Sequence, residues 1–340
     1  MTAKFILHIG AHKTGTTTLQ RVFSANRESL AKAGIWYPNY SEIFPLKTNH
    51  YAHHDLAKGL MGEGNRFNPD EVAEFFELLG QETKKRDWCH TVFLSAEPFL
   101  RGKIKRGDGV NPSVQFQRHL AELVSFSDTE VVLVLRNYVD YLESLYGEQL
   151  SATRYKNSIY EFQETLFERF EYRKIIESWE ENFGPVKPLV YEKLGNGENL
   201  VNSFCSKVFG STLAIQAGDY NRNLSLPIPL LELKRIANRE LSSTDHSLIL
   251  NIIKKLHARR ALSEKYEKKF AWITEEEAKT FLSGYKNDID WLVEKYGEDF
   301  LELKNYRQPR APQFPGWEDK ELNTMLEFLS LQAESEQQQK

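Results

Sequence analysis

Residues 8–17 read HIGAHKTGTT and decide the fold that we expect for this chain. An apolar run at residues 5–7 precedes the stretch, and apolar side chains follow it at the spacing of one helical face, at Leu19, Val22, Phe23 and Leu30. The context is therefore a strand, a glycine turn and a helix. Because backbone N–H groups and the helix dipole favour an anion at a helix start, the stretch predicts a phosphate-like cradle.

The position of the lysine indicates the kind of cradle. In the P-loop of NTPases the lysine directly follows the second glycine. Here Thr16 follows Gly15, and Lys13 comes two residues before that glycine. We expect the anion to be held by the residues from the lysine onward, namely Lys13, Thr14, Gly15, Thr16 and Thr17, with His12 beside them. The alternative is a surface turn that binds nothing.

A second anion contact is predicted at the end of a second buried strand, residues 131–135, VVLVL. Arg136 follows this strand, and Ser144 lies eight residues later on a predicted helix. Open α/β sheets bind ligands at the carboxyl edge of their strands, where Arg and Ser can donate to one anion. The alternative is a solvated helix face on which Arg136 pairs with Asp140 or Glu143.

The two segments together resemble the motifs of sulfotransferases that use 3′-phosphoadenosine 5′-phosphosulfate (PAPS) as donor. Residues 8–20 are similar to the 5′-phosphosulfate loop, most closely that of bacterial carbohydrate-type members, and the Arg136-to-Ser144 spacing is similar to the 3′-phosphate motif. The resemblance implies a P-loop-like three-layer α/β fold, with a central mostly parallel sheet and a helical C-terminal extension. It also implies that a sulfuryl group moves from PAPS to a hydroxyl of a carbohydrate or glycolipid-like acceptor, without a metal.

Weaker similarities to the same family lie further along the chain. VYEKL at residues 190–194 is similar to a strand end of the family, with Lys193 in place of the usual Asp. NRNLS at residues 221–225 resembles another family segment, and Arg222 within it is a candidate contact to the 3′-phosphate or the acceptor pocket.

Sulfuryl transfer needs a base for the acceptor hydroxyl, a cation for the leaving oxygen and donors for the sulfate oxygens. Lys13 is the candidate cation. Glu97 is the expected base, because it follows a predicted buried strand at residues 91–95. The alternative is a structural glutamate that caps the next turn or pairs with Lys13.

Histidines compete with Glu97 for the role of base. His12 flanks the lysine, and His50, His53 and His54 lie in a long connection, residues 34–68. Their alternatives are a polar residue packed on the turn and exposed side chains of the connection. No Cys or Glu cluster at metal-ligand spacing accompanies them, so we expect no metal site.

Two other functions stay open from the sequence. One is a P-loop nucleotide kinase or NTPase, and the other is a non-catalytic protein that binds adenosine bisphosphate. A magnesium-dependent NTPase uses an Asp at the end of a buried strand to hold its metal. The strand at residues 131–135 ends in Arg136 instead, which argues against the kinase.

Composition restricts the partners and the compartment. The chain has 340 residues with 44 basic and 48 acidic side chains, a net charge of −4, and it contains two cysteines. This balance gives no reason to expect nucleic acid as a partner, and we expect a small-molecule or carbohydrate acceptor. The few cysteines and the lack of a long apolar run or leader predict a cytoplasmic protein without membrane insertion. The oligomeric state stays open.

The pattern of elements predicts three parts. Residues 1–226 are the expected PAPS-binding core, residues 227–304 a helical part, and residues 305–340 an extended segment with a polar tail. Further strands are predicted at residues 5–7 and 188–191. Helices are predicted at residues 70–85, 114–126, 159–183, 200–208, 229–241, 246–258 and 275–296.

Overall fold

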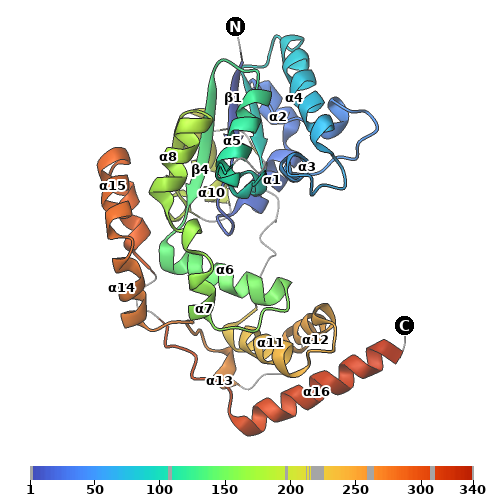
Figure 1. The fold of residues 1–340 in the computed structure, drawn as a ribbon, viewed down its shortest axis with the longest axis vertical. Coiled ribbons are helices and arrows are strands. Elements are labelled where there is room, and N and C mark those ends of the chain that lie inside the picture. The colour runs from blue at the N-terminus through green and yellow to red at the C-terminus, as the bar shows by residue number, and fades with distance from the viewer. Residues whose placement is uncertain are drawn as a thin grey trace. The chain divides into compact units, whose positions relative to one another are not determined.

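The computed structural model describes residues 3–105, 109–195, 198–211, 213, 215, 226–258, 264–306 and 311–338. The chain forms two compact units, whose elements are drawn in Figure 1. The sheet unit comprises Met1–Arg136, Glu171–Arg222 and Asp290–Leu303. The helical unit comprises Asn137–Phe170, Asn223–Ile289 and Lys304–Lys340. The two units alternate along the chain, whereas the predicted parts follow one another, with boundaries after residues 226 and 304.

A five-stranded sheet forms the centre of the sheet unit, with the order β2-β3-β1-β4-β5 and parallel pairing throughout. Its strands are β1 Lys4–His8, β2 Ile35–Trp36, β3 Thr91–Ser95, β4 Thr129–Leu135 and β5 Val186–Val190. The four predicted strands are confirmed. The short edge strand β2 was not predicted, since two residues are too few to show a period. The register pairs His8 with Ser95, so β1 and β3 end side by side at the carboxyl edge.

The helices of the sheet unit cover both faces of this sheet. They are α1 Thr16–Ala25, α2 Arg27–Lys32, α3 His54–Leu60, α4 Pro69–Lys84, α5 Pro112–Leu123, α8 Tyr172–Asn182, α9 Tyr191–Leu194 and α10 Glu198–Phe209, with 3₁₀ turns η1 Tyr40–Glu42, η2 Glu97–Arg101 and η4 Glu298–Lys304. Helix α15, Lys286–Tyr296, begins in the helical unit and ends in the sheet unit.

Alternation along the strands creates the two packed faces. Ile6 of β1 and Phe93 of β3 pack in one core with Phe23 of α1 and the apolar side of α10. Phe5, the neighbour of Ile6, faces the other way and contacts Phe76 of α4. Helix α5 contacts both α4 and α8 along this second face. The predicted three-layer α/β fold is confirmed, and it is P-loop-like in that a glycine turn joins β1 to α1.

The helical unit has an apolar core of its own. Its helices are α6 Tyr138–Ala152, α7 Ile159–Glu164, α11 Ile228–Glu240, α12 His246–Ala258, α13 Glu264–Glu267, α14 Glu275–Ser283 and α16 Asp319–Gln338, with the 3₁₀ turn η3 Phe167–Arg169. Leu230 and Leu233 of α11 pack with Ile249 and Ile253 of α12 and with Leu329 of α16. The predicted helical C-terminal extension is confirmed.

Three expectations about helices were wrong. Residues 275–296 form two helices, α14 and α15, which a turn at residues 284 and 285 separates. Residues 159–183 do not form one helix, because the Thr165 hydroxyl donates to the Phe162 carbonyl at 2.7 Å and the chain leaves α7 there, before α8 begins. Residues 305–340 are not only an extended segment and a polar tail, because α16 occupies most of their second half. Its apolar residues recur at helical spacing, at Leu322, Leu326, Leu329 and Ala333, and pack into the core of the helical unit.

The connection at residues 34–68 carries structure of its own. It contains β2, η1 and α3, and its aromatic residues Tyr37, Tyr40 and Phe67 are buried. Both cysteines, Cys89 and Cys205, are buried free thiols. Among the described helices, none combines the length and the apolar character that crossing a membrane requires.

Candidate anion-binding and acid–base site

The turn between β1 and α1 has strained, closely packed backbone. Lys13 has φ 66° and Gly15, the residue before α1, has φ 74°. A left-handed conformation costs a non-glycine residue about 1–2 kcal/mol, so the surroundings must hold Lys13 in place. A Cβ atom on Gly10 would lie 2.7 Å from His8 Nε2 and from Thr16 Cγ2. Glycine is therefore required where the turn crosses the end of β1.

Two contacts hold this turn. The Thr14 hydroxyl donates to the Ala11 carbonyl at 2.5 Å, and Arg136 Nη1 donates to the Lys13 carbonyl at 2.7 Å. The Arg136 guanidinium also lies over the Tyr191 ring, 5.4 Å from its centre, and its Nε is 4.0 Å from Glu192 Oε1. The predicted arginine at the end of β4 therefore braces the strained lysine directly.

The side chain of Lys13 is left for another partner. The residue is half-buried, and its ammonium group makes no hydrogen bond or ion pair within the described part of the chain. Thr14, by contrast, is fully buried and uses its hydroxyl inside the turn, so its side chain is not available to a ligand. The turn thus offers a cation and backbone donors beside the N-terminus of α1.

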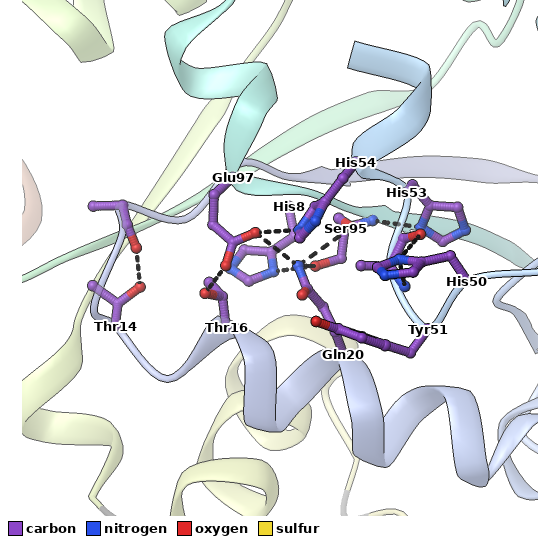
Figure 2. A network of polar contacts seen from close by, with 12 residues as sticks. His8, Thr14, Thr16, Gln20, His50, Tyr51, His53, His54, Ser95 and Glu97 are labelled. Atoms are coloured by element: carbon purple, nitrogen blue, oxygen red, sulfur yellow. Dashed lines mark hydrogen bonds and ion pairs between the residues drawn. The ribbon is translucent and has the colours of Figure 1, made fainter. Parts of the chain in front are cut away.

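Glu97 lies next to this turn, directly after β3, and is only 5% exposed. Thr16 donates to its Oε1, and Gln20 Nε2 donates to its Oε2 at 3.2 Å (Figure 2). His54 Nε2 lies 2.5 Å from the same Oε2. Burial acts to raise the pKa of Glu97, but the hydrogen bond and charge of His54 and the hydroxyl of Thr16 outweigh it and hold that pKa well below its usual range. Glu97 is therefore an ionised carboxylate that is already hydrogen-bonded at both oxygens.

His54 is the more accessible member of the pair. It is the first residue of α3, and its side chain is 24% exposed, against 6% for the side chain of Glu97. The Glu97 carboxylate fixes the ring by accepting from Nε2–H, which leaves Nδ1 as the basic nitrogen. Nδ1 has no hydrogen-bond partner among the residues that the structure describes. The arrangement is a carboxylate that orients an imidazole, as in acid–base catalysis.

His53, the neighbour of His54, attaches the connection to the sheet. Its Nδ1 accepts from the Ser95 backbone N–H at 3.1 Å, and its Nε2 donates to the Pro38 carbonyl at 3.0 Å. Its own backbone N–H donates to the Ser95 carbonyl at 3.0 Å. Burial lowers the pKa of His53 to about 3, so the ring is neutral and both nitrogens have structural partners. These contacts place His54 over the end of β3.

A third histidine lies beneath the turn. His8 is fully buried, its Nδ1 is 2.9 Å from Ser95 Oγ, and Gln20 Nε2 donates to the same Oγ at 3.2 Å. Burial lowers the pKa of His8 to about 4, so it is neutral near pH 7. Because Ser95 Oγ accepts from Gln20, its proton can go to His8 Nδ1, which places the imidazole hydrogen on Nε2. His8 Nε2 is buried beside the turn and has no partner among the described residues.

The structure brings part of the predicted site together. Lys13, Thr14, Gly15 and Thr16 share the turn with half-buried His12 and Thr17, while Arg136 and Glu97 contact Lys13 and Thr16 respectively. Ser144 lies on α6 of the helical unit. Arg222 lies outside the described residues. Sequence reasoning included His54 only as one of several competing histidines, and it missed Gln20 and Ser95 as partners of Glu97 and His8. The four-residue spacing from Thr16 to Gln20, which puts both on one helical face, was the available signal.

The described residues contain no group of three or more His, Cys, Asp or Glu side chains that could hold a metal ion. No protein-family model matches the chain, and no curated protein matches it in sequence. Among solved structures, the chain is similar to a sulfotransferase from Alicyclobacillus acidocaldarius, with 17% identity and a TM-score of 0.38 over 74% of this chain and 96% of that one. A likeness of that size does not establish a shared activity.

Proposed function

We propose that this chain is a sulfotransferase that moves the sulfuryl group of PAPS to a hydroxyl of a carbohydrate or glycolipid-like acceptor. One observation carries the proposal. Lys13 stands at φ 66° beside the N-terminus of α1, and Thr16 of the same turn is hydrogen-bonded to the Glu97–His54 pair. An anion cradle and an acid–base pair are thus joined by one side chain, as transfer of an anionic group to a hydroxyl requires.

The residues of the turn fit a phosphosulfate. The backbone N–H groups of residues 15–17 suit an anion, as does the ammonium of Lys13, which has no partner among the described residues. The buried Nε2 of His8 adds a donor beneath them. When bound, the donor supplies an activated sulfuryl group. Lys13 neutralises the charge that develops on the leaving oxygen, and the N–H groups hold the remaining oxygens. His12 stays a predicted contact to the sulfuryl group or the acceptor.

His54 is the proposed base, and Glu97 the residue that positions it. A base must accept a proton from the acceptor hydroxyl, and Glu97 accepts one poorly because its pKa is held low and its oxygens are hydrogen-bonded. His54 Nδ1 takes that proton, and the Glu97 carboxylate stabilises the imidazolium that forms. The expectation that Glu97 itself is the base is thereby replaced with a positioning role.

Arg136, Ser144 and Arg222 are proposed to bind the 3′-phosphate. Support comes from Arg136, which lies at the carboxyl end of β4 and bonds the lysine-bearing turn with one nitrogen, so that others remain for a phosphate oxygen. It would both brace Lys13 and bind the nucleotide. The cytoplasmic location and the lack of nucleic-acid partners likewise stay predictions.

A magnesium-dependent kinase or NTPase is the second candidate, and the Thr16–Glu97 contact favours it. NTPases hold Mg²⁺ between a hydroxyl of the P-loop and an acid at the end of a buried strand. β3 neighbours β1 as β4 does, and Glu97 follows β3, so the missing acid after β4 does not by itself exclude this function. His54 argues against it, because its ring occupies the position beside Glu97 Oε2.

Calorimetric titration separates the candidates. We expect 3′,5′-adenosine bisphosphate to bind at least about tenfold more tightly than ADP with Mg²⁺, and this preference to vanish in Arg136→Ala. Arg118→Ala is the matched control, because this exposed arginine of α5 contacts Asn182 away from the turn. Tighter binding of Mg-ADP would favour the kinase. Bisphosphate binding without consumption of PAPS, over a panel of hydroxyl acceptors, would identify a non-catalytic binder.

A further inference from the structure

The helical unit contains a cavity of about 240 Å³ that the proposed chemistry does not use. Four parts of the sequence line it: α6 with α7, α11, the segment around residue 272, and residues 313–316. Four aromatic side chains and one ion pair dominate its wall, namely Tyr146, Tyr160, Trp272, Phe314, Glu232 and Arg235. The cavity lies within a single unit, so its shape depends on that unit alone.

Backbone contacts hold the aromatic wall in place. Residue 271 and residues 312–314 are paired, with Ala271 N–H donating to the Pro312 carbonyl at 2.9 Å and Phe314 N–H donating to the Ala271 carbonyl at 3.1 Å. Gln313 Nε2 donates to the Trp272 carbonyl at 3.0 Å. The Trp272 ring meets the Tyr146 ring edge to face, with 4.7 Å between the ring centres. The aromatic wall of the cavity therefore has its shape before any ligand binds.

An ion pair supplies the polar part of the wall. Arg235 Nε donates to Glu232 Oε2 at 2.8 Å, and its Nη2 donates to Oε1 at 2.6 Å. The two side chains are 19% and 16% exposed, so a small ligand has access to both. The pair is neutral as a whole, and it presents acceptors and donors side by side. An anion would compete with Glu232 for Arg235, and a cation would compete with Arg235 for Glu232.

We propose that this cavity binds a single neutral sugar ring. A sugar hydroxyl can donate to a carboxylate and accept from a guanidinium. A neutral ion pair offers both groups side by side without favouring a charged ligand. The apolar C–H faces of a sugar pack on aromatic rings, here those of the half-exposed Tyr160 and the partly exposed Phe314, whereas Trp272 is only 9% exposed. Sites for drug-sized ligands have about 300–1,000 Å³, so this volume suits one monosaccharide rather than a nucleotide. The proposal concerns binding and stands independently of sulfuryl transfer.

The test is calorimetric titration of the full-length protein with methyl glycosides of glucose, galactose and N-acetylglucosamine. We expect saturable millimolar binding of at least one glycoside, which weakens at least about tenfold in Tyr160→Ala and in Glu232→Gln. Phe167→Ala is the matched control, because Phe167 is an exposed aromatic residue of the same unit, 56% exposed against 46% for Tyr160, and lies outside the cavity wall. It should bind as the unchanged protein does, and so should Lys13→Ala, which disables the proposed donor site.

Three results would overturn the proposal. They are the absence of saturable binding to every glycoside, affinity that is unchanged in both Tyr160→Ala and Glu232→Gln, and a preference for acetate or phosphate over the glycosides. Thermal unfolding of each variant shows whether it is folded. If Glu232→Gln unfolds, Tyr160→Ala decides alone, since Tyr160 is 46% exposed.

Discussion

Two regions of the sheet unit converge on Glu97, and they do so by different means. The glycine turn and the start of α1 contribute Thr16 and Gln20, and the connection at residues 34–68 contributes His54 (Figure 2). The first region is held by a contact between near neighbours, the Thr14 hydroxyl on the Ala11 carbonyl, together with one long-range contact, from Arg136 to the Lys13 carbonyl. The second is held by contacts across the sequence, above all those of His53 with Ser95.

The turn and the connection have different tasks in the proposed reaction. In the turn, strained backbone sets the direction of the N–H groups and of Lys13, which together form the proposed anion cradle. In the connection, the side chain of His54 is the proposed base, and buried aromatic and histidine residues hold it in position. Changes in the turn should therefore affect donor binding, strain and the charge on the leaving oxygen, whereas a change of His54 should affect the proton transfer alone.

The largest effect is expected for His54→Asn. Loss of a general base lowers kcat by about 10²–10⁴, while affinity for adenosine bisphosphate should not change. Steady-state kinetics with PAPS and calorimetry measure the two quantities. His50→Asn is the control, because the His50 ring lies 5.6 Å from the His54 ring but does not contact Glu97. A variant of His54 with full turnover would assign the base to another residue.

Lys13→Ala should reduce kcat by about 10²–10³, since a charge beside the leaving oxygen is removed. In contrast to His54→Asn, it should also weaken binding of the bisphosphate, because Lys13 belongs to the cradle itself. Lys58→Ala, an exposed lysine on α3, should leave both quantities unchanged. Full turnover in Lys13→Ala would refute the assignment of the cradle.

Acid should destabilise the two regions together. Burial lowers the pKa of His8 to about 4 and that of His53 to about 3, from 6.5, so the unfolded chain binds more protons than the folded protein below pH 6.5. Stability is therefore complete above that pH and falls as the pH drops, by at most about 1.4 kcal/mol per pH unit for each histidine. The low pKa of Glu97 adds a loss in the same direction below about 4.5.

Urea unfolding at a series of pH values checks this dependence. The asparagine of His8→Asn still offers Ser95 a hydrogen-bond partner but does not titrate. The variant should therefore show a smaller change in the free energy of unfolding between pH 6.5 and about 4. His119→Asn, on the surface of α5 beside Glu122, should leave the slope unchanged. An unchanged slope in His8→Asn would show that His8 is not buried neutral.

The same contrast explains what the sequence predicts. The four longer strands and the three-layer fold follow from the periodicity of apolar residues within short stretches of sequence. The turn follows from the spacing of its glycines and its lysine, so all of these were predicted. The Glu97–His54 pair brings together residues 43 apart, and the contact of Arg136 with Lys13 joins residues 123 apart. Nothing local in the sequence distinguishes His54 from His50 or His53, because only the packing of the connection on β3 gives them different partners.

The smallest effect is expected when a lysine is replaced by glycine, once in the turn and once in the connection. The pair of variants tests which region stores backbone strain. Lys13→Gly relieves a left-handed conformation and should raise the free energy of unfolding by about 0.5–1 kcal/mol, because the relief of about 1–2 kcal/mol exceeds the entropy cost of glycine. Lys58→Gly, inside α3, should lower that free energy by about 1 kcal/mol relative to alanine. Urea unfolding of both variants, with Lys13→Ala and Lys58→Ala as references, measures the difference. Equal losses at both positions would mean that the turn holds Lys13 without strain, and its backbone would then have no special part in presenting the cation.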